Sequence, residues 1–441
     1  MAISKDPVKP SDTLIHKTTN LMQNGLNSHA FGEYGSPNAL GDARWTDELI
    51  LATWYMSETG KVPDHLNYKT GKSGGGFDRL DFKFLSESEW VADPESIVTS
   101  IPLNRRNDHR KQLTPSIPIY GGGMSYGSVS VNVMMARAKN AEKWNTYMST
   151  GEGGYPLDLY AHKDHVITQV ATGYFGVEEK TIQAAPIVEF KYAQGAKPGL
   201  GGHLLASKAG EEVAKMRGSV PFVSLFSPFP FHSTYSVEDH SKHIDWIETV
   251  NPDALIAVKV STPLDVDMVA VGSYYAGAHI IHLDGSYGGT GAAPEIAKKN
   301  IAMPIELALP KVHKFLIKEG VRDKITLIAS GGVRTADDIA KAIALGADGV
   351  VLGTSDLVAM GCTRCGNCEG GPSGRGCPWG LTTTDVELQE WVQQDWAVER
   401  LDNYYTAVMW RLKDILSKLG LNDVKELVGR TDLLRYTAGE D

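Results

Sequence analysis

Two glycine turns in the C-terminal half of the chain constrain its fold more than any other feature. The chain reads SGGVRT over residues 330–335 and GADGVVLGT over residues 346–354. The apolar run 326–329 predicts a buried parallel strand, and the glycines that follow it, Gly331 and Gly332, let an anion approach backbone N–H groups. The first turn therefore predicts a strand that ends at a phosphate.

The segment between the two turns predicts a helix and a further strand. Thr335 and Asp338 form a capping box that predicts the helix start. Residues 348–352 are the expected strand, with Gly353 and Thr354 at its C-terminal end. This order is typical of the last two units of a (β/α)8 barrel, whose loops at that end hold phosphates. An ordinary βαβ unit without a ligand would show the same local pattern.

Short apolar runs precede these turns at the spacing of a barrel. Helical patterns separate most of them, for example over residues 236–250, where Ser236 and Asp239 form another capping box. We therefore expect an α/β fold, a closed (β/α)8 TIM barrel, in preference to an open doubly wound sheet. The runs expected to be strands are 117–120, 146–149, 187–192, 222–226, 255–260, 279–283, 326–329 and 349–352.

The ends of the chain do not follow the barrel repeat. Residues 1–95 are expected to form an N-terminal extension that packs on the barrel or on a partner. The barrel is expected over residues 96–384, including a cysteine loop at 362–377. Residues 385–441 are expected to form a C-terminal helical segment, because apolar residues recur there at helical spacing.

Composition limits the classes of partner. The net charge is −10 and no long basic run occurs, so nucleic acid and anionic membrane surfaces are not expected partners. No apolar stretch reaches the length of a membrane span, and residues 1–13 lack the apolar core of a signal peptide. A cytoplasmic location is the default expectation.

All four cysteines lie in one short segment, which reads Cys362-x2-Cys365-x2-Cys368-x8-Cys377-Pro378. Such clustering does not indicate a disulfide framework. Structural zinc usually takes two well-separated pairs of ligands, whereas three close thiolates and a distant one before proline suit an iron–sulfur cluster. From spacing alone, zinc and free thiols stay open as alternatives.

These motifs together resemble the FMN-binding synthase domain of glutamate synthase. Within that family the resemblance is greatest to the stand-alone third subunit, carrying FMN and an iron–sulfur cluster, of N-methylglutamate synthase. The matching blocks run in the family's order over residues 115–385. They are 122–128 (GGMSYGS), 149–154 (STGEGG), 194–199 (QGAKPG), 227–239, 258–259, 288–292 (GGTGA) and the cysteine segment.

The resemblance implies the residues of an FMN site. The loop after the first strand would line the flavin ring, Lys259 would stabilise the anionic reduced flavin, and the glycine turns would hold its phosphate. The implied cofactor-binding residues are Met124, Ser125, Tyr126, Ser149, Gln194, Lys259, Gly289, Gly331, Gly332, Gly353 and Thr354.

It also implies a dicarboxylate site. Glu152, Lys191, Lys197 and Lys259 are the implied catalytic residues, and Gln194, His203, Arg217 and His232 are the implied substrate-binding residues. Arginine suits the distal carboxylate of 2-oxoglutarate because its fork binds bidentately. On local sequence alone, Arg217 is an ordinary surface arginine, and a turn carboxylate that caps a helix is the alternative interpretation of Glu152.

The chain departs from the family at two of these places. His203 stands where the family usually has glutamine, and Asp284-Gly285-Ser286-Tyr287 replaces the usual Ser-Gly-His-Asp. His240 and His243 are one helical turn apart, but no acidic partners with a ligand pattern accompany them. We interpret those two histidines as part of a solvated helix face, with a metal as the minor alternative.

The glutamate synthases hold a 3Fe–4S cluster on three cysteines, and the additional Cys365 would permit 4Fe–4S. The resemblance further implies a hetero-oligomer in which a glutamine-amidotransferase-like subunit and other subunits supply what this chain lacks. No cysteine lies outside the cluster motif, and no Gly-x-Gly-x-x-Gly nucleotide motif follows a strand.

The expected activity is formation of N-methylglutamate from glutamate and methylamine through 2-iminoglutarate on FMN. One alternative is a glutamate synthase that reduces 2-oxoglutarate with ammonia. An alternative of another class is an electron-transfer or assembly subunit that retains the cofactors without turning over a substrate of its own.

Overall fold

The computed structural model describes residues 40–42, 44–64, 76–232, 234–289, 297, 301–368 and 375–437. Eight parallel strands close into a barrel in chain order, with β9 pairing back to β2. The prediction of a (β/α)8 TIM barrel is therefore confirmed. The strands are β2 (Ile119–Gly121), β3 (Met148–Ser149), β4 (Val166–Ala171), β5 (Ile187–Lys191), β6 (Leu255–Ser261), β7 (Ile280–Asp284), β8 (Thr326–Ser330) and β9 (Gly349–Leu352).

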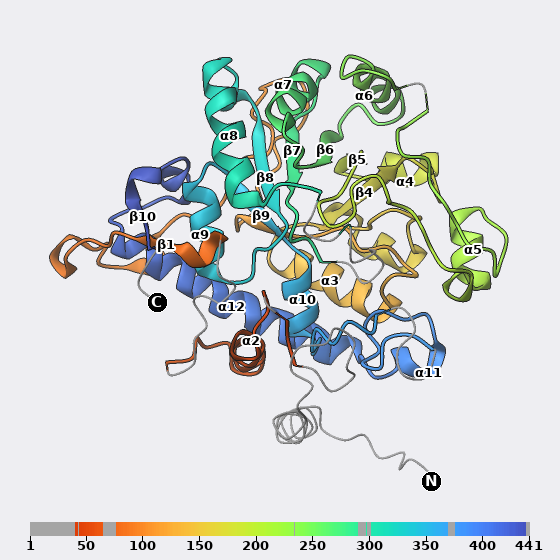
Figure 1. The fold of residues 1–441 in the computed structure, drawn as a ribbon, viewed down its shortest axis with the longest axis horizontal. Coiled ribbons are helices and arrows are strands. Elements are labelled where there is room, and N and C mark those ends of the chain that lie inside the picture. Colours follow the sequence, from red (N-terminus) through yellow and green to blue (C-terminus); the bar gives the residue numbers. More distant parts are fainter. Residues whose placement is uncertain are drawn as a thin grey trace, which may run out of the picture.

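Helices between the strands surround the barrel (Figure 1). Helix α9 begins where the capping box predicted, because Thr335 Oγ1 accepts the Asp338 N–H at 3.1 Å. The helix over 236–250 starts later than predicted, at His240. The helices of the barrel and its loops are α3 (Val131–Lys143), α4 (Glu179–Ala184), α5 (Glu211–Arg217), α6 (His240–Val250), α7 (Val266–Ala276), α8 (Ile305–Lys318), α9 (Ala336–Ala344) and α10 (Thr354–Ala359).

One predicted strand is wrong and one strand was missed. Residues 222–226 form no barrel strand: Phe222 adopts φ 59° and Phe226 is 71% exposed. The fully buried run Val166–Ala171 is the strand that the prediction lacks. Its Gln169 interrupts the apolar pattern, and the packed barrel tolerates this amide because it donates to Glu189. Consequently the segment 187–191 is the fourth barrel strand and not the third.

The C-terminal segment packs beneath the barrel together with the N-terminal helix. Helix α12 (Gln394–Lys418) runs beside α2 (Asp47–Thr59) and also contacts α3 (Figure 1). Further along, β1 (Leu80–Phe82) pairs antiparallel with β10 (Leu434–Tyr436). The remaining elements are α11 (Val386–Gln389) and the 3-10 turns η1 (Gly76–Arg79), η2 (Glu87–Glu89), η3 (Pro94–Ser96), η4 (Leu157–His165), η5 (Ala206–Lys208), η6 (Arg322–Lys324), η7 (Val424–Leu427) and η8 (Thr431–Leu433).

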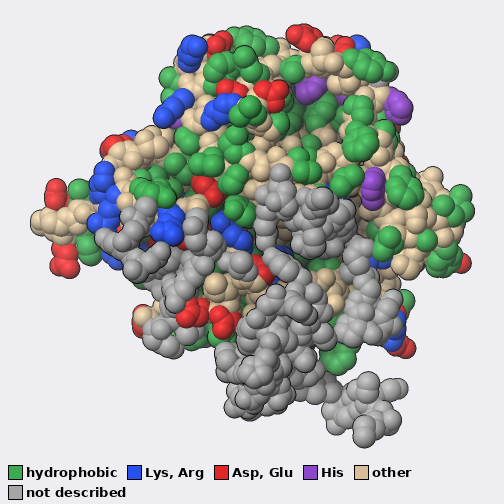
Figure 2. All heavy atoms as spheres, in the orientation of Figure 1, with side chains coloured by type: hydrophobic (Ala, Val, Ile, Leu, Met, Phe, Trp, Pro, Cys, Tyr) green, Lys and Arg blue, Asp and Glu red, His purple; other side chains and the backbone are tan. Residues whose placement is uncertain are grey.

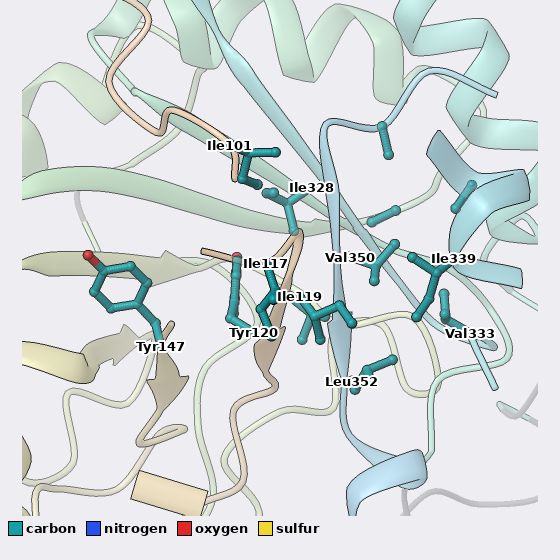
Figure 3. Packing of buried hydrophobic residues seen from close by; sticks show 14 of the residues in the cluster. Ile101, Ile117, Ile119, Tyr120, Tyr147, Ile328, Val333, Ile339, Val350 and Leu352 are labelled. Carbon is teal, nitrogen blue, oxygen red and sulfur yellow. The ribbon is translucent and has the colours of Figure 1, made fainter. Parts of the chain in front are cut away.

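The barrel core is closed by branched aliphatic side chains. Ile101 lies beside Ile328, and Ile119 and Val350 come from the pair of strands that closes the barrel (Figure 3). All four are at most 2% exposed. A Cβ at Gly349 would lie 2.9 Å from Ile101 Cδ1, so the absence of a side chain there lets Ile101 fill the end of the barrel.

The surface carries both signs of charge. On the face shown in Figure 2, acidic side chains are interspersed with basic ones, and basic side chains gather towards the side of β1 and β10. Among the residues with described positions, no helix combines the length and apolar character needed to cross a membrane.

Candidate active site

A cavity of about 670 Å³ opens at the C-terminal ends of the barrel strands. That is the end at which TIM barrels place their chemistry. Most of the predicted site residues line this one cavity although they come from distant parts of the sequence. They are Met124, Ser125, Glu152, Lys191, Gln194, Lys197, His203, Arg217, Lys259, Gly289, Gly331, Gly332, Gly353, Thr354, Cys362, Cys365, Cys368 and Cys377.

Three predicted site residues lie elsewhere. Ser149 is buried at the end of β3, and the Tyr126 ring reaches outward to Glu212, although its backbone carbonyl accepts from Arg217. His232 lines a separate cavity of about 500 Å³. The prediction for His232 depended on a strand over 222–226, which the structure does not form.

The acidic and basic groups of one cavity wall form an ion pair. Lys191 Nζ lies 2.8 Å from Glu152 Oε1, and the Gly202 N–H donates to the same oxygen at 2.7 Å. Burial alone would raise the pKa of Glu152, but Lys191, the Gly202 N–H and Lys197 outweigh it and hold this pKa below its ordinary value. Glu152 therefore faces the cavity as a carboxylate.

Arg217 points from the end of α5 into the same wall. Its Nη2 donates to Ser125 Oγ at 3.1 Å and to the Tyr126 carbonyl at 3.2 Å, while its buried Nε has no protein partner among the described atoms. A Cβ at Gly153 would lie 2.6 Å from the guanidinium carbon, so glycine is needed for this approach. Burial lowers the pKa of Arg217, and Glu152 opposes that effect. The guanidinium therefore adds positive charge to this wall of the cavity.

The predicted phosphate turns lie together elsewhere along the same cavity. Gly331 and Gly332 have φ of 93° and 105°, which L side chains rarely adopt. A Cβ at Gly289 would lie 2.1 Å from Thr354 Oγ1, so these two loops are in direct contact. A Cβ at Gly353 would meet nothing within 4 Å. The backbone at Gly353 therefore borders open space.

The N-terminal segment reaches this wall, which the sequence did not reveal. The Arg44 guanidinium stacks on the Tyr287 ring with 3.8 Å between its Cζ and the ring centroid. Its Nη2 would lie 3.0 Å from a Cβ at Gly332. Asp42 binds Arg364 of the cysteine loop at 2.6 Å. No local motif marks residues 42 and 44, because their partners lie about three hundred positions later and only the closed fold brings them together.

Lys259 has a counter-ion within the protein. Its Nζ lies 3.8 Å from Asp284 Oδ2, at one of the positions where the chain departs from the family pattern. We expected the buried lysine to require the anion of a reduced cofactor. Asp284 supplies a resident anion, because Lys259 and His282 hold its pKa below the ordinary value against the effect of burial.

The interpretation of His240 and His243 as a solvated helix face is wrong. Both are 7% exposed. His240 stacks on Tyr192 with 4.0 Å between ring centroids, and His243 hydrogen-bonds Tyr192 Oη at 2.9 Å and Tyr174 Oη at 3.3 Å. Burial lowers the pKa of His240 to about 4, so the two rings act as neutral aromatic core residues.

The four cysteines line the cavity beside the phosphate turns. Burial raises the pKa of Cys362, and the neighbouring Cys368 and Cys377 raise it further. Within the described ranges, no three His, Cys, Asp or Glu side chains are arranged to hold a metal ion. The donor chemistry suits iron, but the described geometry alone does not form a complete site.

Known proteins are similar to this chain in sequence, and a solved structure is similar to it in fold. Residues 90–422 match the family described as "Conserved region in glutamate synthase". The archaeal-type glutamate synthase [NADPH] of Dehalococcoides mccartyi is 36% identical over 418 residues, covering 89% of this chain and 81% of that protein. The archaeal glutamate synthase [NADPH] of Methanocaldococcus jannaschii is 39% identical over 410 residues, covering 91% and 77%.

A solved structure with the same fold is a soluble mutant of the membrane-associated (S)-mandelate dehydrogenase from Pseudomonas putida. It has a TM-score of 0.52 at 14% identity and covers 96% of this chain and 99% of that chain. At this identity the likeness shows the fold alone. The match over residues 90–422, together with relatives that are 36% and 39% identical over most of their length, shows that the chain belongs to the glutamate synthase family.

Proposed function

We propose that this chain is the catalytic subunit of a glutamate-synthase-type enzyme that binds FMN and acts at the α-carbon of glutamate. The observation that carries the proposal is the pairing of two walls in one cavity. One wall offers cationic groups around Glu152, and the other offers glycine turns beside Lys259. The names of the relatives, glutamate synthases, support the same reaction class.

The residues present fit FMN. Two buried polar atoms of the cavity lining, Gln194 Nε2 and Ser286 Oγ, have no protein partner among the described atoms, and such atoms are costly unless a ligand or water completes them. The open space at Gly353 would accept the phosphate, and Lys259 would place positive charge beside the ring. When bound, FMN supplies the acceptor and donor of a hydride.

The cavity lining around Glu152 and Arg217 fits a five-carbon dicarboxylate. Arg217 would place its positive charge beside one carboxylate, and Lys197 would add charge for the second. Glu152 is ionised, so it would accept a proton from the substrate nitrogen, and the Lys191 ammonium would hold Glu152 in place for its return. Fixing both carboxylates holds the α-carbon in one position relative to the second wall.

We further propose that the amine is methylamine, so that glutamate and methylamine give N-methylglutamate and ammonia. This net exchange needs no external reductant, because the hydride that leaves the α-carbon returns to the same carbon. Its support is the resemblance described above and the presence of His203 in the cavity where the family usually has glutamine. Ammonia as the amine, with 2-oxoglutarate as acceptor, is the candidate that the names of the relatives favour.

An isotope experiment on the assembled enzyme separates the candidates. Glutamate deuterated at the α-carbon is supplied with methylamine and no added reductant. N-methylglutamate that keeps deuterium at the α-carbon is the expected product. A strict requirement for reduced ferredoxin or a nicotinamide nucleotide in every turnover would instead establish ordinary glutamate synthase chemistry. No product under either condition would favour an electron-transfer subunit.

We also propose an iron–sulfur cluster on the cysteine segment. The support is the thiol-rich spacing and the position of all four cysteines along the cavity. Such a cluster would connect the site to an electron-donating partner subunit. The roles assigned above to Glu152, Lys191, Lys197 and Arg217 do not depend on it.

A further inference from the structure

A continuous chain of buried polar side chains crosses the barrel beneath the cavity. Gln169 Nε2 donates to Glu189 Oε1 at 2.6 Å, and Glu189 Oε2 lies 2.8 Å from His282 Nδ1. These residues come from β4, β5 and β7. Glu189 and His282 are each 1% exposed, so solvent does not satisfy them.

The chain continues to the cavity wall. His282 Nε2 lies 2.8 Å from Ser330 Oγ, which donates to Asp284 Oδ1 at 2.6 Å. The other oxygen, Asp284 Oδ2, accepts from the Gly195 N–H at 2.8 Å and lies 3.8 Å from Lys259 Nζ. Ser330, Asp284 and Lys259 all line the cavity, so the buried His282 is connected to it by a single hydroxyl.

The donor and acceptor roles in these hydrogen bonds indicate which nitrogen atoms of the His282 ring carry a proton. Ser330 has one proton, which it gives to Asp284, so its oxygen accepts from a protonated His282 Nε2. Glu189 accepts from Gln169 and, as a carboxylate, can only accept from His282 Nδ1. Burial would raise the pKa of Glu189, but His282 and Lys259 outweigh it and keep the pKa low. These hydrogen bonds therefore have both ring nitrogens of His282 donating, one to the Glu189 carboxylate and one to the Ser330 hydroxyl.

We propose that Glu189, His282 and Ser330 form a proton relay that controls the charge of the Asp284–Lys259 pair. When negative charge accumulates in the cavity beside Lys259, the His282 Nε2–H bond breaks as Ser330 takes that proton, and the Ser330 proton forms an O–H bond on Asp284. No electron moves and no outside proton is needed. The pair changes from neutral to singly positive, while Glu189 and His282 together become singly negative.

The surroundings of the relay contain few other charges. Lys259 on β6 and Asp284 on β7 face it from the cavity side, and Glu189 on β5 faces it from below. The ring of Tyr120 on β2 lies edge-on to His282 at 6.2 Å, and burial raises the pKa of Tyr120 so that it stays neutral. A proton on His282 therefore has two hydrogen-bonded acceptors among the described groups: Glu189 directly, and Asp284 on the cavity side through Ser330.

The protonation of His282 can be measured directly. Nitrogen NMR of protein labelled in its 13 histidines, with the signal assigned by its loss in His282→Gln, reports both ring nitrogens. We expect an imidazolium in the oxidised holoprotein and a neutral ring after reduction by dithionite. A neutral ring in the oxidised protein would overturn the assignment, and an imidazolium in both states would overturn the relay.

A variant of the hydroxyl separates the relay from a structural role. The Ser330→Ala variant lacks the hydroxyl that joins His282 to Asp284, so the proton cannot reach the Asp284–Lys259 pair. The reduced flavin is then less stabilised, and spectroelectrochemistry should give a more negative midpoint potential for the bound FMN. Thr326→Val removes a buried hydroxyl at the other end of β8 and should leave the potential unchanged. Equal potentials in Ser330→Ala and the wild type would contradict the proposal.

This inference rests on the proposed function only in taking FMN as the source of the negative charge. If the chain bound no flavin, the proposed function would fail. The NMR measurement on the same protein would still decide whether His282 is an imidazolium, so the two failures are distinguishable.

Discussion

Lys191 Nζ lies 2.8 Å from Glu152 Oε1 at a cavity wall where both side chains are at most 14% exposed. The pair joins the loop after β3 to the end of β5. It therefore links the loop that carries Gly153 to β5 and places one negative and one positive group at the cavity wall.

The first prediction concerns Glu152→Gln. The change leaves the Lys191 ammonium without its charged partner. The free energy of unfolding should therefore fall by about 1–3 kcal/mol. The pKa of Glu152 is depressed in the folded protein, so the contribution of the carboxylate is full above the ordinary glutamate value and is lost as pH falls through the folded value. Urea unfolding of both proteins should therefore show a difference that narrows on acidification. A difference independent of pH would contradict the ion-pair account.

The second prediction concerns Arg44 and the phosphate. Arg44→Gln should weaken FMN binding roughly 10- to 100-fold, the loss expected for one charged hydrogen bond, with little effect on riboflavin, which lacks the phosphate. Fluorescence titration of the apoprotein with each flavin measures both affinities. Arg430→Gln, an exposed arginine paired with Asp432, is the matched control. Equal losses for FMN and riboflavin would place Arg44 away from the phosphate.

The barrel could be predicted from the sequence because glycine turns and capping boxes are features of short, local segments. Sequence reasoning missed Val166–Ala171, whose Gln169 is polar because it bonds to Glu189 inside the barrel. It misassigned 222–226, whose aromatic residues lie exposed in a loop. It also missed Arg44 and the partner of Lys259, since long-range closure alone brings these groups to the cavity.

The third prediction tests the glycine turn. Gly332→Ala should lower FMN occupancy, because φ of 105° disfavours a side chain and the new Cβ would lie 3.0 Å from Arg44 and Tyr287. Gly320→Ala is the control, since φ is 68° there and its Cβ would meet nothing within 4 Å. Flavin content after purification is the readout. Full occupancy in Gly332→Ala would argue against this turn as the phosphate site.

The fourth prediction concerns the cysteines. Replacement of Cys362, Cys368 or Cys377 by alanine should abolish bound iron and sulfide. Cys365→Ala tests nuclearity: a retained 3Fe–4S signal in electron paramagnetic resonance is expected if the extra thiolate serves only a fourth iron. Stoichiometric zinc without iron in the wild type would overturn the cluster proposal.

The central claim is that one cavity holds both the flavin and a glutamate whose carboxylate is bound by Arg217. The most direct measurement is anaerobic bleaching of the flavin absorbance by glutamate as the only reductant. The wild type should bleach, and Arg217→Lys should need far more glutamate because a point charge replaces a fork. A flavin that dithionite reduces but glutamate does not, at any concentration, would contradict the account.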